Sequence, residues 1–276
     1  MTAPGSGVFP RLRTFLPVAF GGLLLAATAT LQAQHSPEPP QRKLAIIIDD
    51  LGNQRREGLE ALALPGPVAM AFLPHTPFAR QLARQAHAQG KEVLLHLPMQ
   101  ATHDAESPGP GVMTLDHTRG QFARLLADNL DSVPHVSGIN NHMGSLLTRH
   151  PGHMGWLMEE LKQRPRVFFV DSYTTHLSIA LQIAREQEVP ALKRDVFLDR
   201  VVTRAAMARE LDRLKNLADE QGFGIGIGHP HKETLAFLAE QLPLLERDGF
   251  DLVPVRSLLP FRAQQKAQTW HAYSSP

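Results

Sequence analysis

The stretch Lys43-Leu-Ala-Ile-Ile-Ile-Asp-Asp-Leu-Gly52 decides the fold of this chain. Its apolar run, 44–48, is rich in β-branched side chains and has the length of a strand. A continuous apolar run is typical of a strand covered on both faces, as in a parallel sheet between helices. Two adjacent carboxylates, Asp49 and Asp50, follow this run. The first predicted strand therefore carries acids at its carboxyl end.

The same pattern continues along the chain, where short apolar runs alternate with longer segments of helical period. This alternation indicates repeated βα units around a parallel sheet. Seven or eight such units fit a β/α barrel, which has about 250 residues, better than an open doubly wound sheet. We expect one α/β domain, a single, distorted, seven- or eight-stranded β/α barrel. The candidate strands are 44–49, 68–73, 92–97, 136–139, 167–171, 191–193, 223–227 and 252–255.

Four connecting segments carry apolar residues at helical spacing. Such stripes predict helices whose apolar side packs on the core, so we interpret them as core and not as cofactor sites. The stripes are Phe122, Leu125, Leu126 and Leu130; Met154, Leu157, Met158 and Leu161; Met207, Leu211, Leu214 and Ala218; and Leu235, Leu238, Leu242 and Leu245.

The amino-terminal residues have the pattern of a signal peptide. Arg11 and Arg13 precede a mostly apolar run, 15–31, and Ala33 offers a small residue for cleavage. An uncleaved anchor is the alternative, although the run is short for a spanning helix of about 20 apolar residues. We expect an exported, periplasmic protein that is not an integral membrane protein after cleavage. The expected segments are a signal peptide, 1–33; a linker, 34–42; the barrel, 43–260; and a tail, 261–276.

Composition narrows the possible partners and chemistry. The 28 Lys and Arg against 27 Asp and Glu leave no charge excess that would favour a nucleic acid as partner. The chain has no cysteine but 14 histidines, so a metal would be held by histidines and carboxylates. The signatures of zincin metalloproteases, serine hydrolases and P-loop nucleotide enzymes are absent from the sequence. Nothing in the sequence identifies a protein partner, so protein partners are unknown.

Ionisable or metal-binding residues follow six of the candidate strands. In a β/α barrel the carboxyl ends of the strands meet at one rim, where the reacting groups lie. One such residue would suggest only a turn or a helix cap. Six converging positions instead predict a site at the rim. They are Asp49 and Asp50, His75, His96, Asn140 to His142, Asp171, and His229 to His231.

Three of these residues form a possible metal set. Asp50, His96 and His142 would supply two imidazoles and one carboxylate and leave positions open for water and substrate. Zinc fits such a set well, and iron, manganese or cobalt would fit it too. Asp49 would stay free as a general base beside the ion.

The segment 222–229 alternates glycine with Phe223, Ile225, Ile227 and His229. It lacks the spacing of a dinucleotide-binding loop and fits a barrel strand with one glycine face and one apolar face. We expect His229 at the barrel mouth as a general acid, with Asp171 orienting it or raising its pKa. Asp199 and His231 would serve either a helix start or a substrate contact.

Six ordered motifs resemble the divergent polysaccharide deacetylase family of bacterial envelope proteins. The likeness covers about 43–259 and implies the barrel of the glycoside hydrolase/deacetylase superfamily, whose better-known members remove N- or O-acetyl groups from chitin-like or peptidoglycan sugars. It implies that Asp49 is the general base, Asp50 and His96 are metal ligands, Asp171 is a partner and His229 is the general acid. The motifs are Ile48 to Gly52, Leu95 to Met99, Gly138 to Ser145, Val170 to Ser172, Arg194 to Asp199 and Ile227 to His231.

The sequence also departs from the well-characterised deacetylases that the family resembles. Those carry a second histidine four residues after the first, where this chain has Gln100, and their arginine motif has no clear counterpart here. His142 as third ligand therefore rests on the strand-end argument alone.

The predicted function is a metal-dependent hydrolase, with zinc as the best fit, that removes acetyl or similar acyl groups from a polysaccharide or peptidoglycan-like sugar. Asp49 would take a proton from water and His229 would protonate the leaving amine. One alternative is a non-catalytic envelope protein that binds glycan or a protein partner, which Gln100 favours. A glycosidase is the other, although adjacent acids do not present the opposed carboxylates of that chemistry.

Overall fold

The computed structural model describes residues 42–103 and 108–260. The expected signal peptide, all but one residue of the expected linker, and the expected tail lie outside these residues. None of the helices in the part of the chain that is described is long and apolar enough to cross a membrane.

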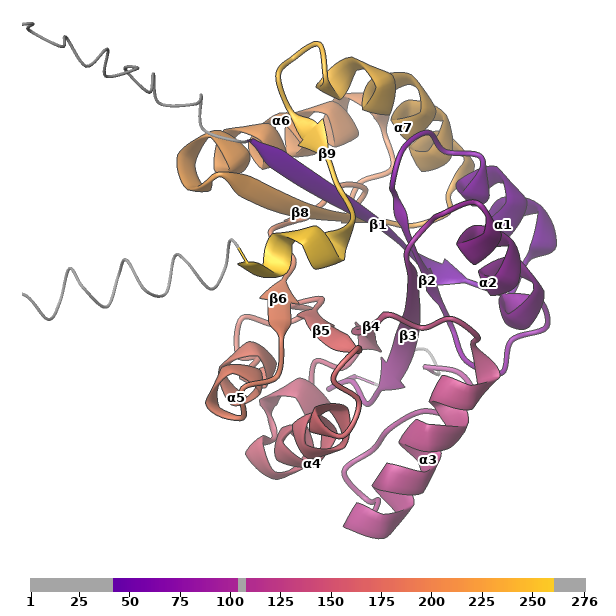
Figure 1. Cartoon of the computed structure of the whole chain (residues 1–276), viewed down its shortest axis with the longest axis vertical. Coiled ribbons are helices and arrows are strands. Elements are labelled where there is room, and N and C mark those ends of the chain that lie inside the picture. Colours follow the sequence, from indigo (N-terminus) through magenta and orange to yellow (C-terminus); the bar gives the residue numbers. More distant parts are fainter. Residues whose placement is uncertain (1–41, 104–107, 261–276) are drawn as a thin grey trace, which may run out of the picture. The chain divides into compact units, whose positions relative to one another are not determined.

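One parallel sheet organises the described residues (Figure 1). Its strands are β1 (Lys43–Leu51), β2 (Ala69–Phe72), β3 (Val93–Met99), β4 (Gly138–Met143), β5 (Phe168–Asp171), β6 (Ala191–Lys193), β7 (Val196–Phe197), β8 (Phe223–Gly228) and β9 (Asp251–Leu252). They are ordered β6-β5-β4-β3-β2-β1-β8-β7, and β9 pairs with β1 off this path. The curled sheet confirms the predicted deacetylase-type β/α barrel, with β6 and β7 at the two ends of the path.

Seven α-helices in the described ranges connect the strands and lie around the outside of the sheet (Figure 1). They are α1 (Arg55–Leu62), α2 (Ala79–Ala88), α3 (Arg119–Ser132), α4 (Pro151–Lys162), α5 (Ala180–Glu186), α6 (Arg204–Gln221) and α7 (Lys232–Leu245), with short 3-10 helices η1 (Leu147–Arg149) and η2 (Val255–Leu258). All four predicted stripes fall on these helices, and nearly all of their residues are buried.

The two sides of the sheet bury different cores. On β1, Leu44, Ile46 and Ile48 pack outward against the helices. Ala45 and Ile47 belong to a second cluster inside the barrel, to which β8 and η2 also contribute. Because side chains alternate along a strand, each strand has a fixed inner and outer set. This alternation decides which residues reach the inside of the barrel mouth.

Three details differ from the sequence prediction. The strand expected at 136–139 is β4, Gly138–Met143, so Asn140, Asn141 and His142 lie within it and do not follow it. Val196–Phe197 forms a strand that was not predicted, because two residues are too few to show a period of alternation. The strand expected at 252–255 ends at Leu252, and Val255 begins η2. Pro254 lies between them, and a residue without an N–H group cannot continue the ladder as a donor.

The glycine face of β8 is where helix α6 approaches. A Cβ at Gly224 would lie 2.8 Å from Leu214 Cδ1 and 3.1 Å from the Leu214 carbonyl oxygen. The Gly face therefore permits close packing of helix on strand, as the alternation in the sequence indicates.

We expect Gly224→Ala to lower the free energy of unfolding by about 1–3 kcal/mol, because the added methyl overpacks this contact. Urea unfolding measures the change. Gly120→Ala is the matched control, since a Cβ at that helical position has its nearest neighbour at 3.6 Å. A Gly224→Ala protein as stable as wild type would contradict the packing argument.

Candidate active site

Alternation along the strands brings three of the predicted residues to the inside of the barrel mouth. Asp49 continues the inner side of β1 after Ile47, and His96 continues that of β3 after Leu94. His229 follows Ile227 of β8 in the same way. Inner side chains at the carboxyl ends of parallel strands share one rim. The predicted convergence of these three residues at one rim therefore agrees with the structure.

Asp50 reaches the same site because β1 is irregular at its end. A regular strand would turn Asp49 and Asp50 to opposite sides. The register between β1 and β2 shifts between Ile48 and Leu51, and Asp50 has a φ of 57°, which is rare for a residue with a side chain. As a result, Asp50 Oδ1 lies 3.1 Å and Asp49 Oδ2 lies 3.6 Å from the same atom, His96 Nε2. Backbone strain of this kind is concentrated at functional sites.

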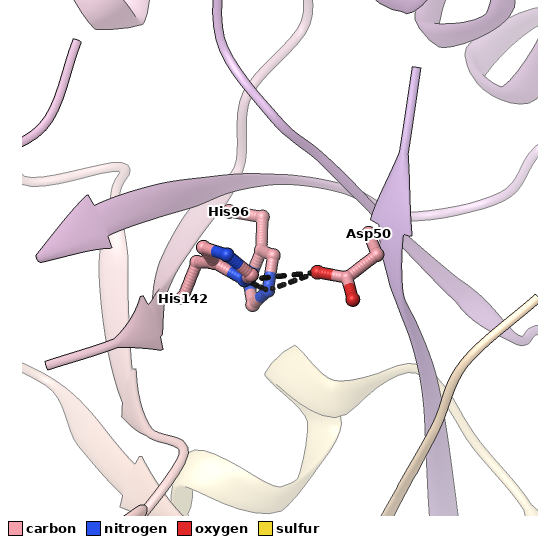
Figure 2. A group of neighbouring side chains, drawn as sticks. All are labelled: Asp50, His96 and His142. Carbon is pink, nitrogen blue, oxygen red and sulfur yellow. Dashed lines mark hydrogen bonds and ion pairs between the residues drawn. The ribbon is translucent and has the colours of Figure 1, made fainter. Parts of the chain in front are cut away.

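Asp50, His96 and His142 bring three possible ligand atoms together (Figure 2). Asp50 Oδ1 lies 2.9 Å from His142 Nδ1, and His142 Nδ1 lies 3.1 Å from His96 Nε2. Asp50 Oδ1 is buried, yet it accepts no hydrogen bond of good geometry. An unsatisfied buried carboxylate oxygen facing two imidazole nitrogens fits a divalent cation, which would be held by these three atoms.

Asn140 connects His96 to Asp49. Its Oδ1 lies 3.0 Å from His96 Nδ1, and its Nδ2 donates to Asp49 Oδ1 at 2.8 Å. With the amide in this orientation, His96 Nδ1 carries a proton, and Nε2 is the nitrogen that faces Asp50. Asn140 therefore sets the tautomer of His96 and the orientation of Asp49 with one side chain.

The two carboxylates of β1 have pKa values shifted in opposite directions. Burial raises the pKa of Asp49 above its usual value, and the charges of His96 and His229 offset only part of this effect. Burial also acts on Asp50, but His142 and His96 outweigh it and hold the pKa of Asp50 far below its usual range. Neighbouring carboxyl groups with pKa values moved apart can take different roles. Asp50 suits a ligand, and Asp49 suits a group that exchanges a proton.

His229 is held by Asp199, and the expected contact with Asp171 is not formed. Asp199 Oδ1 lies 2.9 Å from His229 Nδ1, and Asp199 Oδ2 accepts from the His229 backbone N–H at 2.6 Å. Thr234 Oγ1 also donates to Asp199 Oδ2. Burial alone would lower the pKa of His229, but the bond to Asp199 and the charge of Asp49 raise it to about 9. The imidazole is therefore protonated at neutral pH.

Alternation along β5 explains why Asp171 does not meet His229. Phe168 and Val170 face the barrel interior, and Phe169 packs on the outer side. Asp171 shares the parity of Phe169 and accepts bonds from Tyr173 N at 2.8 Å and Ser178 Oγ at 2.7 Å. Ser172 takes the inner position instead and lies 3.2 Å from Asn140 Nδ2. The alternation of residues 168–171 in the sequence could have predicted that Asp171 lies on the outer side of the strand.

The His229–Asp199 pair predicts a pH-dependent stability of the metal-free protein. The pKa of His229, about 9 in the folded state, exceeds about 6.5 for an unfolded histidine. The contribution of the charged His229 to the free energy of unfolding is therefore largest below about pH 6.5 and is lost as the pH rises through about 9. Urea unfolding in EDTA should show the gap between wild type and His229→Asn shrinking across this window. A gap that does not change with pH would contradict the charged pair.

Gln100 does not take part in the metal set. Its Oε1 accepts from the Leu115 backbone N–H at 2.9 Å, so the side chain fixes the segment that follows β3. His75 is another predicted rim residue. Its Nε2 lies 2.9 Å from Oδ1 of Asn129 in α3, so the side chain contacts that helix and not the metal set. His142 is thus the histidine that accompanies Asp50 and His96.

Two cavities meet at Asp50. One, of about 200 Å³, is lined by Asp50, His142, Pro98 and the 108–110 segment. The other, of about 420 Å³, is lined by Asp50, His229, Phe197 and Arg200 among others. Both cavities therefore reach Asp50, one together with His142 and the other together with His229.

Known proteins resemble this chain over most of its length. Uncharacterized protein YibQ of Escherichia coli (strain K12) is 34% identical over 252 residues, which span 91% of this chain and 75% of that protein. An uncharacterized protein of Haemophilus influenzae is 35% identical and covers 75% of this chain and 74% of its own length. The crystal structure of uncharacterized protein ATU2773 from Agrobacterium tumefaciens C58 has a TM-score of 0.76 at 23% identity, with 80% of this chain and 90% of that chain covered.

The divergent polysaccharide deacetylase family matches residues 46–259. This range contains Asp49, Asp50, His96, His142 and His229, and it agrees with the resemblance seen in the motifs. The fold of ATU2773 supports the same barrel. The chain belongs to the divergent polysaccharide deacetylase family.

Proposed function

We propose that this protein is a metal-dependent hydrolase that removes acetyl or similar acyl groups from a polysaccharide or related sugar. The observation that carries the proposal is the buried, unsatisfied Asp50 Oδ1 between His96 and His142, beside an uncoordinated Asp49. A base, an acid and a set of three ligands converge on one rim that two cavities reach.

Asp50, His96 and His142 would hold the cation. A divalent ion bound there, with zinc as the best fit, would supply Lewis acidity toward water and an acyl oxygen. Asn140 and Asp199 would be positioning residues, because each bonds to a side chain with a proposed chemical role.

Asp49 and His229 would move the protons. Asp49 takes one proton from water while the oxygen of that water forms a bond to the acyl carbon. The bond from the acyl carbon to the sugar nitrogen then breaks, and His229 gives its proton to that nitrogen. The products are a carboxylic acid and a free amine. The protonated state of His229 at neutral pH suits this role.

The site of action would be the cell envelope. The amino-terminal pattern of Arg11, Arg13 and an apolar run supports export to the periplasm, where an acylated envelope glycan is available. The near balance of acidic and basic residues favours no nucleic-acid partner.

The test uses residues 34–276 purified without a histidine tag. We expect near-stoichiometric divalent metal by elemental analysis, and release of acetate from acetylated chitin or peptidoglycan oligosaccharides that stops on chelation and returns with added zinc. Bound metal without turnover across these substrates would favour the glycan-binding alternative. Absence of metal under replete conditions would overturn the proposal.

A further inference from the structure

The cavity beside His229 is lined by an arginine side chain that has no ion-pair partner among the described residues. Arg200 lines this cavity and is exposed. Among the described residues it makes no hydrogen bond and no ion pair. Side chains that carry no partner at the edge of a catalytic cavity are candidates for substrate contacts.

The two carboxylates that line the same cavity as Arg200 are already engaged. Asp199 is fully buried in its side chain and accepts bonds from His229 and Thr234. Asp50 faces His96 and His142. Neither forms an ion pair with Arg200, so the charge of Arg200 is available to a ligand in this cavity.

A second arginine near the cavity shows the contrast. Arg194 is buried, donates to the backbone oxygens of Ser172 and Tyr173, and stacks on Phe197 at 3.7 Å. It is a structural residue. Arg200 has none of these contacts, although both belong to the segment between β6 and α6.

The charge lies on one side of the site only. The smaller cavity on the other side of Asp50 has no lysine or arginine in its described lining. His231 also lines the cavity beside His229; it is the N-cap residue of α7, and its side chain makes no capping hydrogen bond. A substrate would therefore meet a cationic region on the side of His229 alone.

Resting on the proposed function, we infer that Arg200 selects acylated sugars that carry a carboxylate on the leaving-amine side. The acid that protonates the leaving nitrogen must contact it, so the sugar bearing that nitrogen occupies the His229 cavity. A planar guanidinium there can bind a carboxylate through two parallel hydrogen bonds. The substrate class is an acidic N-acyl sugar, and Arg200 is a specificity residue for it.

The test compares two probes of nearly equal size. One is a peptidoglycan tetrasaccharide whose lactyl groups carry free carboxylates, and the other is its methyl ester. In steady-state assays wild type should prefer the acid in kcat/KM. Arg200→Ala should lower the acid-over-ester ratio by about 10- to 100-fold, mainly through KM, as for loss of a charge-assisted hydrogen bond. Arg200→Lys should retain part of the preference.

Arg209→Ala is the matched control, because Arg209 is an exposed arginine of α6 that lies outside the cavity lining. It should leave the ratio unchanged. An Arg200→Ala protein with the wild-type ratio, or a wild type with no preference for the acid, would overturn the inference while the hydrolase proposal stands.

Calorimetric binding of the same probes separates the two proposals. Tighter binding of the acid that depends on Arg200, in a protein that releases no acetate, would sustain the inference and remove the proposed function. Equal binding of acid and ester would overturn the inference whether or not turnover is seen.

Discussion

Replacement of Asp49 by asparagine should lower kcat for deacylation by about 10²–10⁴-fold, the usual contribution of a general base. Asparagine can still accept the bond that Asp49 Oδ1 receives from Asn140, so the site should keep its shape. It cannot take a proton from water. Acetate release under saturating substrate measures the effect.

The metal content of Asp49→Asn protein shows whether the loss is chemical. Asp49 is not among the three grouped ligand residues, Asp50, His96 and His142. Elemental analysis should therefore find the wild-type amount of metal. Loss of metal together with activity would place Asp49 among the ligands, and unchanged kcat would remove it from the mechanism.

Asp171→Asn is the informative control for this experiment. Asp171 is also a buried carboxylate at a strand end, but its partners are Tyr173 and Ser178 on the outer side of β5. We expect kcat within about tenfold of wild type, because no proton-transfer group is removed. A loss as large as that of Asp49→Asn would restore the catalytic role that the sequence resemblance implies for Asp171.

Much of the site could be predicted because strand ends converge. The apolar run before Asp49 and Asp50 marks a buried parallel strand, and the carboxyl ends of such strands form one rim. This reasoning places Asp50, His96 and His142 together without any measured distance, and the structure groups the same three residues. Their roles as ligands remain a proposal.

The partner of His229 could not be predicted in the same way. Asp199 follows β7, a strand of two residues whose place beside β8 is set by the order of the sheet. The order of strands in the sheet depends on the packing of the whole barrel, so it cannot be predicted from the sequence of a short segment. Asp171 was the more conspicuous acid because it ends a longer apolar run, but the parity of β5 turns it outward.

His142→Ala is expected to weaken metal binding by more than about 100-fold, since even outer-shell changes cost about 10- to 100-fold in affinity. His142 Nδ1 supplies one of the three grouped ligand atoms, and β4 places it by pairing Pro98 with His142. Dialysis against a competing chelator, followed by elemental analysis, measures the change. Acetate release should fall in parallel and return in part at high added zinc.

Gln100 stands where well-characterised deacetylases carry their second histidine. Gln100→Ala is therefore the control that shows whether His142 or the Gln100 position supplies the third ligand. Gln100 Oε1 bonds to the Leu115 backbone, so its loss should loosen that segment and leave metal affinity near the wild-type value. If His142→Ala protein kept its metal while Gln100→Ala protein lost it, the proposed ligand set would be wrong. If both kept it, the metal would be bound without His142, either by Asp50 and His96 or by the second group of possible ligands, Asp199, His229 and His231. Loss of metal in the His142→Ala protein alone would mean that His142 of the neighbouring strand β4 takes the place of the second histidine of the well-characterised deacetylases.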